Sequence, residues 1–285
     1  MPLLKALFLG TGGAVPRATR PLSGIYVEDW EGHRLLLDAS EGVQYRLLEN
    51  GISPASLDFV AISHAHEDHI LGLPGLIATA RLMGRQPKVL APPKLAEELA
   101  RLGYDVATSA EDRRLRISCV PVCHTVEACG WLLEWDVGYR LDKAKAEGLP
   151  RWALTKLIKG EAVEVEGRVI RPEEVADPSS KRFKRLFYTG DTGPCPSAVE
   201  PLKWVDVLIH EATFADDVDP AEAHKEGHST VADAVEAARA LGASLLVLTH
   251  ISARYEDKAR HRALAAASGL NAVVPDDYEW LLIQL

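Results

Sequence analysis

The sequence lacks the long apolar runs of a membrane protein. No stretch contains the roughly eighteen consecutive apolar residues that a transmembrane helix needs. The first fifteen residues contain one lysine and a short apolar patch that Gly10 interrupts, which indicates a first strand and a tight turn rather than a secretory signal peptide. We therefore expect no membrane partner.

Cysteine is scarce, and so are the thermolabile residues. The four cysteines are Cys119, Cys123, Cys129 and Cys195, with no C-x-x-C pair, so we expect no structural disulfide and a reducing, cytoplasmic location. Cys123 lies beside His124, but a buried apolar thiol is the commoner fate of such a residue than a metal ligand. Asn and Gln together number five and Met two, a scarcity typical of heat-adapted proteins.

Positive charge is scarce as well, and it is unevenly distributed. The chain has 32 Lys and Arg against 41 Asp and Glu, and the net charge of −9 argues against a broad surface that coats nucleic acid. Residues 139–185 are the exception, with twelve basic and eight acidic residues, so the remainder carries −13. This segment ends in KRFKR and has weak periodicity. It is either a solvated loop or a local patch for a polyanion, and we predict an arm inserted into a single domain that spans residues 1–285.

Elsewhere, apolar runs alternate with helical patterns. KLAEELARLG and STVADAVEAARALG each end in glycine, which is typical of a helix stop. Alternating strands and helices predict an α/β fold. The predicted strands are KALFLG, RLLLDA, LDFVAIS, KVLAP, LRISCVPV, RLFYTG, VDVLIH, LLVLTH and EWLLIQL.

Three histidines and two acids lie within six positions of SHAHEDHILG, residues 63–72. The histidines are His64, His66 and His69, with Glu67 and Asp68 between them. Their spacing differs from the H-E-x-x-H pattern of zinc proteases, whose histidines are four apart on one helical face. Because the cluster follows a predicted strand directly, we expect it in the loop at that strand's exit.

Other histidines and acids also follow predicted strands: His124, Asp191, His210 with Glu211, and His250. Loops beyond strand ends are where α/β proteins build their sites. One such histidine is usually a surface or core residue, but five strand exits are hard to explain without a shared site. Imidazole and carboxylate favour zinc or a similar divalent ion. The donors exceed what one tetrahedral ion needs, so the sequence predicts two ions about 3.5–4 Å apart.

Several motifs resemble a known family. SHAHEDH matches the H-x-H-x-D-H signature of the metallo-β-lactamase superfamily, and His124, Asp191 and His250 match its later ligand positions. Within it, the chain is similar to the ribonuclease Z family of tRNA 3′-processing endonucleases. The motifs that carry this resemblance are FLGTGGAVP, DHILGLPGL, HEATF, GHST and LTHISARY, which extend from residue 7 to residue 255.

The resemblance implies a four-layer αββα sandwich, two metal ions and a set of site residues. The ligands would be His64, His66 and His124 for one ion, Asp68, His69 and His250 for the other, and Asp191 for both. Asp68 would also act as general base, and Glu211 with His228 would protonate the leaving group, a 3′-alkoxide that departs poorly without an acid. His228 has an alternative interpretation as part of a turn before a helix that Ser229 caps.

Further residues are assigned more loosely by the same resemblance. Asp38 matches an aspartate that orients loops near the site, although a simple strand-end turn would also account for it. Substrate contacts are expected at the cations of KRFKR, because residues 139–185 hold the positive excess of the chain, and at Arg254 of the last motif; these residues are Lys181, Arg182, Lys184, Arg185 and Arg254. The remaining histidines, His33, His224 and His261, match nothing and are predicted on the surface.

The resemblance implies a zinc-dependent endoribonuclease that removes the 3′ trailer of precursor tRNA by means of a water activated by two metals, and it suggests a homodimer. Two alternatives stay open. One is a hydrolase of the same fold acting on a small phosphodiester, lactone or sulfate ester; it is favoured by the arm, which has LPRWAL where the family has a Gly-Pro element. The other is a non-catalytic binding module, which would have no need of seven ligands.

Overall fold

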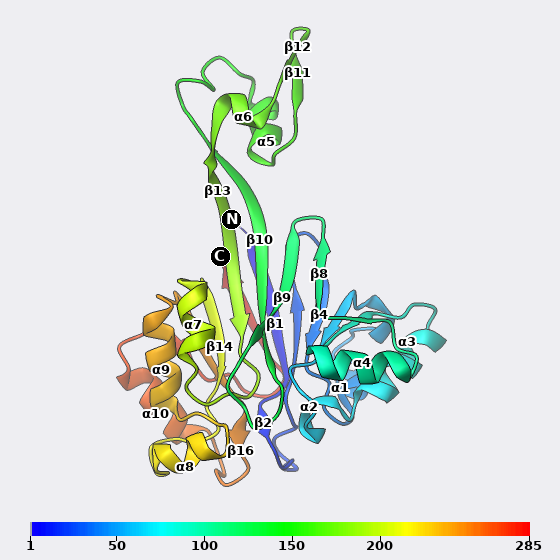
Figure 1. Ribbon diagram of the computed structural model, residues 1–285, viewed down its shortest axis with the longest axis vertical. Helices are drawn as coiled ribbons and strands as arrows, with labels where there is room; N and C mark the ends of the chain where they lie inside the picture. Colours follow the sequence, from blue (N-terminus) through cyan, green and yellow to red (C-terminus); the bar gives the residue numbers. More distant parts are fainter. Residues whose placement is uncertain (1) are drawn as a thin grey trace. The chain divides into compact units, whose positions relative to one another are not determined.

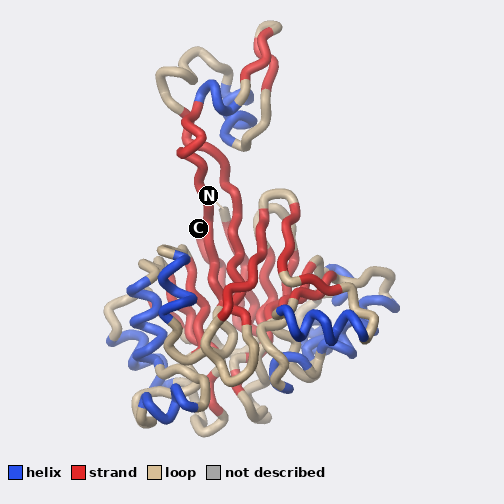
Figure 2. The backbone as a smooth tube through the Cα atoms, viewed as in Figure 1, coloured by secondary structure: helices blue, strands red, loops and turns tan. Residues whose placement is uncertain are grey.

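The structure is a computed structural model that describes residues 2–285, apart from the side chain of Pro178. It is built on two seven-stranded sheets (Figures 1 and 2). The first has the order β18-β1-β3-β4-β5-β6-β7. Its strands are β1 (Leu3–Gly10), β3 (Gly24–Glu28), β4 (Arg34–Leu37), β5 (Phe59–Ala61), β6 (Lys88–Leu90), β7 (Val106–Ala107) and β18 (Glu279–Gln284).

The second sheet has the order β17-β15-β14-β13-β10-β9-β8. Its strands are β8 (Ser109–Asp112), β9 (Leu115–Pro121), β10 (Cys129–Leu141), β13 (Ala176–Tyr188), β14 (Val207–Glu211), β15 (Leu245–Thr249) and β17 (Ala272–Val273). Two small two-stranded sheets pair β2 (Gly12–Gly13) with β16 (Ile251–Ser252) and β11 (Val163–Val165) with β12 (Arg168–Ile170).

Helices cover the outer face of each large sheet, so the predicted αββα layers are confirmed (Figure 1). The first sheet carries α1 (Val43–Glu49), η1 (Pro54–Ser56), α2 (Glu67–Ile70), α3 (Leu73–Leu82) and α4 (Pro93–Arg101). The second carries α7 (Pro196–Leu202), α8 (Pro220–Lys225), α9 (Val231–Ala240) and α10 (Ala259–Ala267). The two helices predicted from glycine stops are α4 and α9. Among residues 2–285, no helix is long and apolar enough to cross a membrane.

Apolar side chains join each helix layer to its sheet. Leu36 and Val60 of the first sheet share a buried cluster with Leu76 of α3. In the second sheet, Leu208 shares a cluster with Val235 of α9. This burial, worth about 1.5–3 kcal/mol for each large aliphatic side chain, is the main source of stability for such layers.

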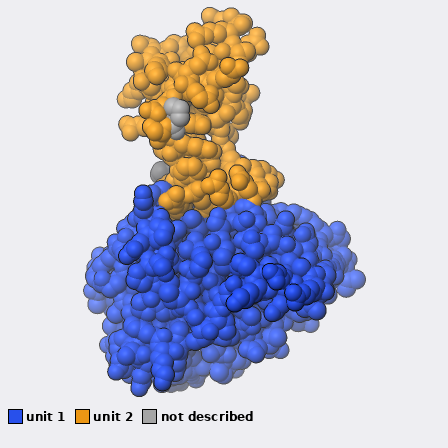
Figure 3. Space-filling model, viewed as in Figure 1, with its two compact units in different colours: residues 1–110, 117–132, 186–285 blue, residues 111–116, 133–185 orange. Residues whose placement is uncertain are grey.

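The chain divides into two compact units, which Figure 3 colours separately. Unit 1 comprises residues 1–110, 117–132 and 186–285, and unit 2 comprises residues 111–116 and 133–185. The predicted arm, 139–185, falls within unit 2, which also holds α5 (Arg151–Ile158) and α6 (Pro172–Val175). Unit 2 has a small core of its own, formed by Ala153, Leu157, Val163, Ile170 and Val175.

The prediction that the chain has no structural disulfide is wrong. Cys119 pairs with Cys129, and Cys123 pairs with Cys195, with Cα separations of 5.2 and 5.3 Å. The first pair joins adjacent strands, and the second joins two loops 72 residues apart. Spacing alone did not indicate either bond, because the partners meet only once the second sheet has formed. Cys123 is consequently neither a buried thiol nor a metal ligand.

The surface prediction for the unmatched histidines is also wrong for two of them. His33 is 1 % exposed and its ring contacts Asp29 at 2.7 Å, while His261 is fully buried and donates from Nε2 to the carbonyl of Ala212. His224 is partly exposed and lies 3.0 Å from Asp233. Buried imidazoles with a polar partner are ordinary core residues.

Parallel pairing brings the strand exits together. β13, β14 and β15 are parallel neighbours in the second sheet, and β4 and β5 are parallel neighbours in the first. Carboxyl ends of parallel strands lie at one edge of a sheet, so the loops after them converge. Most of the predicted site residues lie in these loops or at the strand ends before them, whereas His124 lies in the loop after β9 and His228 lies between α8 and α9; all of them belong to unit 1.

Candidate active site

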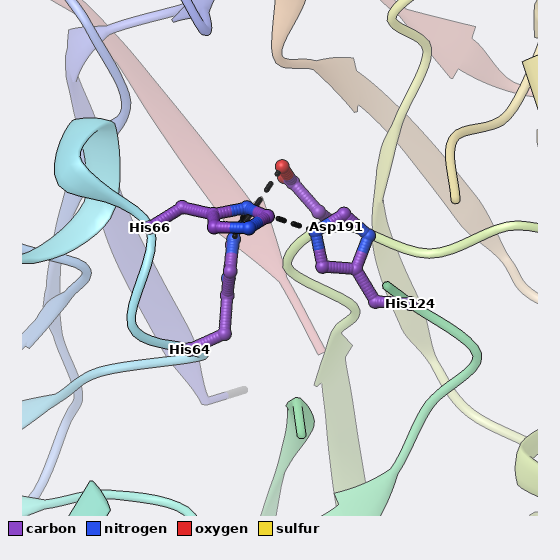
Figure 4. Close-up of side chains that lie close together, drawn as sticks. All are labelled: His64, His66, His124 and Asp191. Atoms are coloured by element: carbon purple, nitrogen blue, oxygen red, sulfur yellow. Dashed lines mark hydrogen bonds and ion pairs between the residues drawn. The ribbon is translucent and has the colours of Figure 1, made fainter. Parts of the chain in front are cut away.

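The predicted ligands form two groups that share Asp191. The first group contains His64, His66, His124 and Asp191, and Figure 4 shows their side chains turned toward a common point. The Nδ1 atom of His66 lies 3.0 Å from Nε2 of His64 and 3.1 Å from Nε2 of His124. Oδ2 of Asp191 lies 3.7 Å from Nε2 of His64.

The second group contains Asp68, His69, Asp191 and His250. Nε2 of His69 and Nε2 of His250 face each other at 3.3 Å. Oδ2 of Asp68 lies 3.4 and 3.3 Å from these two nitrogens, and Oδ1 of Asp191 lies 3.3 and 3.2 Å from them. All seven predicted ligands are therefore brought together.

These separations fit divalent ions. A tetrahedral ion with bonds of about 2.0–2.1 Å holds its donor atoms about 3.3 Å apart, and the observed separations scatter around that value. Oδ1 of Asp191 is buried and accepts no hydrogen bond, an arrangement that is costly unless a cation satisfies the oxygen. The donor set is imidazole and carboxylate, which suits zinc and related ions.

Hydrogen bonds on the outer side of the histidines fix which ring nitrogen faces inward. Nδ1 of His69 donates to Oδ2 of Asp38 at 2.7 Å, and Nδ1 of His64 lies 2.9 Å from the hydroxyl of Ser63, which itself donates to Asp38. Tyr188 donates to the same carboxylate oxygen at 2.6 Å. Asp38 is fully buried and thus orients two ligand histidines, a role that a simple strand-end turn would not require.

Two more histidines are held in the same way. Nδ1 of His124 donates to the carbonyl of Gly227 at 2.8 Å. Nδ1 of His250 donates to the hydroxyl of Thr213 at 2.9 Å, and that hydroxyl donates in turn to Glu211 at 2.5 Å. Each ring directs its Nε2 toward the other predicted ligands, the arrangement that metal binding requires.

The electrostatic environment favours a cation. Burial lowers the pKa of His64 well below its ordinary value, and it lowers that of His124 as well, so both rings stay neutral. Burial also lowers the pKa of His69, but the carboxylates of Asp191 and Asp38 outweigh it and raise that pKa well above the usual value. The same negative charge would stabilise divalent ions at this position.

Unusual backbone conformations surround the site. Ala14, Asp38 and His250 have φ angles of 57°, 59° and 57°, in the left-handed region that non-glycine residues seldom adopt. The backbone N–H of Ala14 donates to Oδ2 of Asp68 at 2.7 Å. A Cβ atom on Gly13 would lie 2.4 Å from the His250 ring, so only glycine permits this approach. Such conformations are typical of functional sites.

Glu211 and His228 form a hydrogen-bonded pair beside the ligands. Nδ1 of His228 donates to Oε1 of Glu211 at 2.9 Å, and the His228 and His250 rings are stacked with centroids 5.5 Å apart. Burial lowers the pKa of His228, but the Glu211 carboxylate outweighs this and raises it to about 9. Burial raises the pKa of Glu211, and the charge of His228 nevertheless holds it below its ordinary value. Because of this raised pKa, His228 is a charged imidazolium at neutral pH.

Further hydrogen bonds hold the Glu211 carboxylate, and the sequence interpretation missed them. The backbone N–H of Thr192 donates to Oε1 at 2.9 Å, and that of Ser229 donates to Oε2 at 3.1 Å. The hydroxyl of Thr213 also donates to Oε2. Thr213, Ser229 and Ser63 lie inside the HEATF, GHST and SHAHEDH motifs, which was the available signal, whereas Tyr188 lies in none of the quoted motifs. The cap of α9 is made by Thr230 rather than Ser229.

At least two of the five residues predicted to contact substrate form ion pairs within the protein. In unit 2, Lys181 pairs with Asp136 at 3.1 Å, and Arg185 pairs with Glu134 at 2.6 Å. Arg182 is exposed, as is Arg254 in unit 1, whose guanidinium lies 5.4 Å from the centre of the Phe214 ring. The KRFKR segment continues strand β13 and is not a free loop.

Comparison with known proteins places this architecture in a family. A family model described as "Beta-lactamase superfamily domain" matches residues 33–251. Ribonuclease Z of Pyrobaculum arsenaticum is 67 % identical over 100 % of both chains, and ribonuclease Z of Saccharolobus solfataricus is 35 % identical over 99 % of this chain and 100 % of its own. The crystal structure of human tRNase Z, short form, shares the fold with a TM-score of 0.66 at 22 % identity, over 99 % of this chain and 100 % of that one. The chain therefore belongs to the ribonuclease Z family of the β-lactamase superfamily.

Proposed function

We propose that this protein is a metal-dependent endoribonuclease that removes the 3′ trailer of precursor tRNA. The observation that carries the proposal is the match to ribonuclease Z at 67 % identity along the whole chain. The site geometry supports it, because the seven ligand positions are accompanied by the Glu211–His228 pair. A binding module would need neither.

Two divalent ions per chain, zinc by preference, are part of the proposal. One would be held by His64, His66, His124 and Asp191, and the second by Asp68, His69, Asp191 and His250. When bound, such ions would lower the pKa of a water molecule and neutralise charge at the phosphate. Their support here is the tetrahedral spacing of the donor atoms.

The protein's own residues would handle the protons. Asp68, held by the N–H of Ala14, is placed to accept a proton from the attacking water. As the bond between phosphorus and the 3′ oxygen breaks, Nε2 of His228 would give that oxygen a proton. Glu211 binds the opposite ring nitrogen and stabilises the charged form of His228 before transfer. After transfer, His228 is neutral and must take up a proton from solvent to restore the acid.

Recognition of the tRNA body is assigned to the basic segment of unit 2, with Arg254 of unit 1 near the reacting end. The ion pairs of Lys181 and Arg185 reduce the charge available for phosphate. That observation favours the second candidate, a hydrolase of a small phosphodiester, lactone or sulfate ester. The Glu211–His228 pair favours the nuclease, because an alkoxide leaving group needs a proton donor.

A homodimer in a cytoplasmic compartment completes the proposal. The homodimer is carried over from the resemblance to the ribonuclease Z family, and the exposed apolar side chains of Tyr45, Leu71 and Leu82 are candidates for its contact surface. Disulfides do not contradict a cytoplasmic location in a heat-adapted protein, since intracellular proteins of hyperthermophiles carry them. Light scattering of the purified protein tests the dimer, and a monomer at micromolar concentration would contradict it.

The function is tested by supplying both substrate classes. The protein, loaded with Zn²⁺, is incubated with precursor tRNA and separately with bis(p-nitrophenyl) phosphate, and the RNA ends are mapped. A single cut at the 3′ end of the tRNA body supports the nuclease. Rapid hydrolysis of the small diester with intact precursor tRNA would support the second candidate.

A further inference from the structure

We infer that the Cys123–Cys195 disulfide positions the active site, by fixing the loop that carries His124 against the loop that carries Asp191. This inference rests on the proposed metal centre. Cys123 directly precedes His124, and Cys195 lies four residues after Asp191. The Cα atoms of the two cysteines are 5.3 Å apart, within the range that a disulfide spans. Both loops contribute donors to the group His64, His66, His124 and Asp191.

Backbone hydrogen bonds run beside the bridge and extend its effect to the proton donor. The N–H of Gly193 donates to the carbonyl of Cys123 at 2.8 Å, and the N–H of Cys123 donates to the hydroxyl of Thr192 at 3.2 Å. The N–H of Thr192 in turn holds Oε1 of Glu211. The same loop therefore contacts a ligand position and the carboxylate that charges His228.

A cavity and solvent lie beside the bridge. Thr192, Gly193 and Cys195 line a cavity of about 260 Å³, although Thr192 and Cys195 are themselves only 2 % and 8 % exposed. Cys123 is exposed. A covalent bond between loops far apart in sequence adds to the hydrogen bonds and burial of the Asp191 loop, because it removes relative motion that separate loops would retain.

The second disulfide joins two strands rather than two loops and provides a control. Cys119 and Cys129 are ten residues apart on β9 and β10, neighbours in the sheet whose ladder already aligns them. Neither residue is next to a predicted ligand in the sequence, although the N–H of Cys129 donates to the carbonyl of Ser63, the residue before His64. Cys129 is 1 % exposed and Cys119 is half-buried, whereas Cys195 is 8 % exposed and Cys123 is exposed, so a reductant in solution reaches the Cys123–Cys195 bond more readily through Cys123.

Reduction of the bridge would loosen the site without unfolding the sheets. Dithiothreitol gives two electrons and two protons to the bond, which becomes the thiols of Cys123 and Cys195, while the reagent is oxidised to its cyclic disulfide. His124 and Asp191 then keep their spacing only through hydrogen bonds and the burial of the Asp191 loop. Loss of the groups that orient metal ligands typically weakens metal affinity by about 10–100-fold, and we expect a loss in that range.

The test compares two double variants of the full chain, Cys123→Ser/Cys195→Ser and Cys119→Ser/Cys129→Ser. Removing both thiols of a pair avoids a free cysteine that could bind the ion. Zn²⁺ affinity is measured by chelator competition, melting temperature by calorimetry, and kcat and KM by cleavage of precursor tRNA. We expect Cys123→Ser/Cys195→Ser to weaken Zn²⁺ binding by about 10–100-fold and to lower kcat more than KM. The control should lower the melting temperature but leave Zn²⁺ affinity within about twofold.

If one of the double variants does not fold, a second measurement on the native protein still tests the inference. Native protein is treated briefly with dithiothreitol, alkylated and analysed by peptide mass spectrometry, and its Zn²⁺ affinity is measured on the same sample. Labelling of Cys123 and Cys195 together with weaker binding supports the inference. Equal Zn²⁺ affinity in the two double variants, or free thiols in the untreated protein, would overturn it. A wild-type protein that binds Zn²⁺ tightly but leaves tRNA intact would contradict the proposed function alone.

Discussion

Replacing Glu211 with Gln isolates the charge that makes His228 an acid at neutral pH. The amide oxygen can keep the hydrogen bond from Nδ1, but the substitution removes the charge that contributes most to raising the pKa of His228 to about 9. Burial, which lowers this pKa, remains, and so do Asp191 and Asp68, which raise it, so in the variant the pKa should fall toward its ordinary value of about 6.5. The pH at which the cleavage rate declines on the alkaline side should fall together with the pKa of His228.

The expected size follows from the protonated fraction. With a pKa of about 9, about nine-tenths of His228 is protonated at pH 8, and with a pKa of about 6.5 about 3 % is. Glu211→Gln should therefore slow cleavage of precursor tRNA about 30-fold at pH 8 but less than twofold at pH 6. Further lowering by burial would enlarge the effect at both values.

Single-turnover cleavage from pH 5.5 to 10, with Zn²⁺ content measured at each pH, provides the assay. Bis(p-nitrophenyl) phosphate serves as control, because p-nitrophenolate departs without a proton and its hydrolysis should not show the alkaline decline. An alkaline decline near pH 9 in both proteins would refute the assignment of His228 as the acid.

The same pair affects stability, and its sign is fixed by the direction of the shift. The folded state raises the pKa of His228, so the stabilisation is complete below about pH 6.5 and is lost as pH rises through about 9. Wild type should lose more stability than Glu211→Gln over that interval. Urea unfolding of both proteins at pH 6.5 and 9.5 measures the difference, and equal losses would contradict the pairing.

Four more outcomes are expected. His228→Ala should retain both ions yet slow cleavage of precursor tRNA by about 10²–10⁴-fold, with much less effect on the p-nitrophenyl ester; equal losses on both would remove the proton-donor role. Gly13→Ala places a Cβ 2.4 Å from the His250 ring. Zn²⁺ affinity, measured by chelator competition, should therefore fall by about 10–100-fold. Unchanged affinity would show that the loop containing Gly13 moves freely. Asp38→Asn should weaken Zn²⁺ binding in the same range, because the carboxylate no longer orients His69; affinity equal to wild type would exclude this. Changing the four cations of residues 181–185 to Ser should flatten the salt dependence of tRNA binding by up to about 3 to 4, since each phosphate contact contributes ~0.9 to the slope; an unchanged slope would mean that the segment does not contact RNA.

Much of the site could be predicted because the chemistry of metal binding restricts residue types. His64, His66 and His69 directly follow an apolar strand, a density of imidazole that neither a solvated loop nor a buried core requires, and the later ligands follow strands in the same way. Strand exits are set by local patterns, and parallel pairing brings them to one edge. The residue types at the strand exits and the positions of those exits are both set by short segments of sequence, so both predictions are confirmed in the structure.

The rest depends on contacts between distant segments, which local patterns do not encode. Tyr188 reaches Asp38 across 150 positions, and Cys123 reaches Cys195 across 72. No local pattern marks His33 and His261 as buried, yet Asp29 and the carbonyl of Ala212 satisfy them in the interior. Their burial follows from how the layers pack.

The tRNA-processing activity is tested by mapping the ends of precursor tRNA cleaved by the Zn²⁺-loaded wild-type protein. We expect one cut at the 3′ end of the tRNA body, which leaves a free 3′ hydroxyl on the tRNA fragment. This cleavage should be lost when a chelator removes the ion and restored by Zn²⁺. Precursor tRNA left intact by a protein that binds two ions and hydrolyses bis(p-nitrophenyl) phosphate would contradict it.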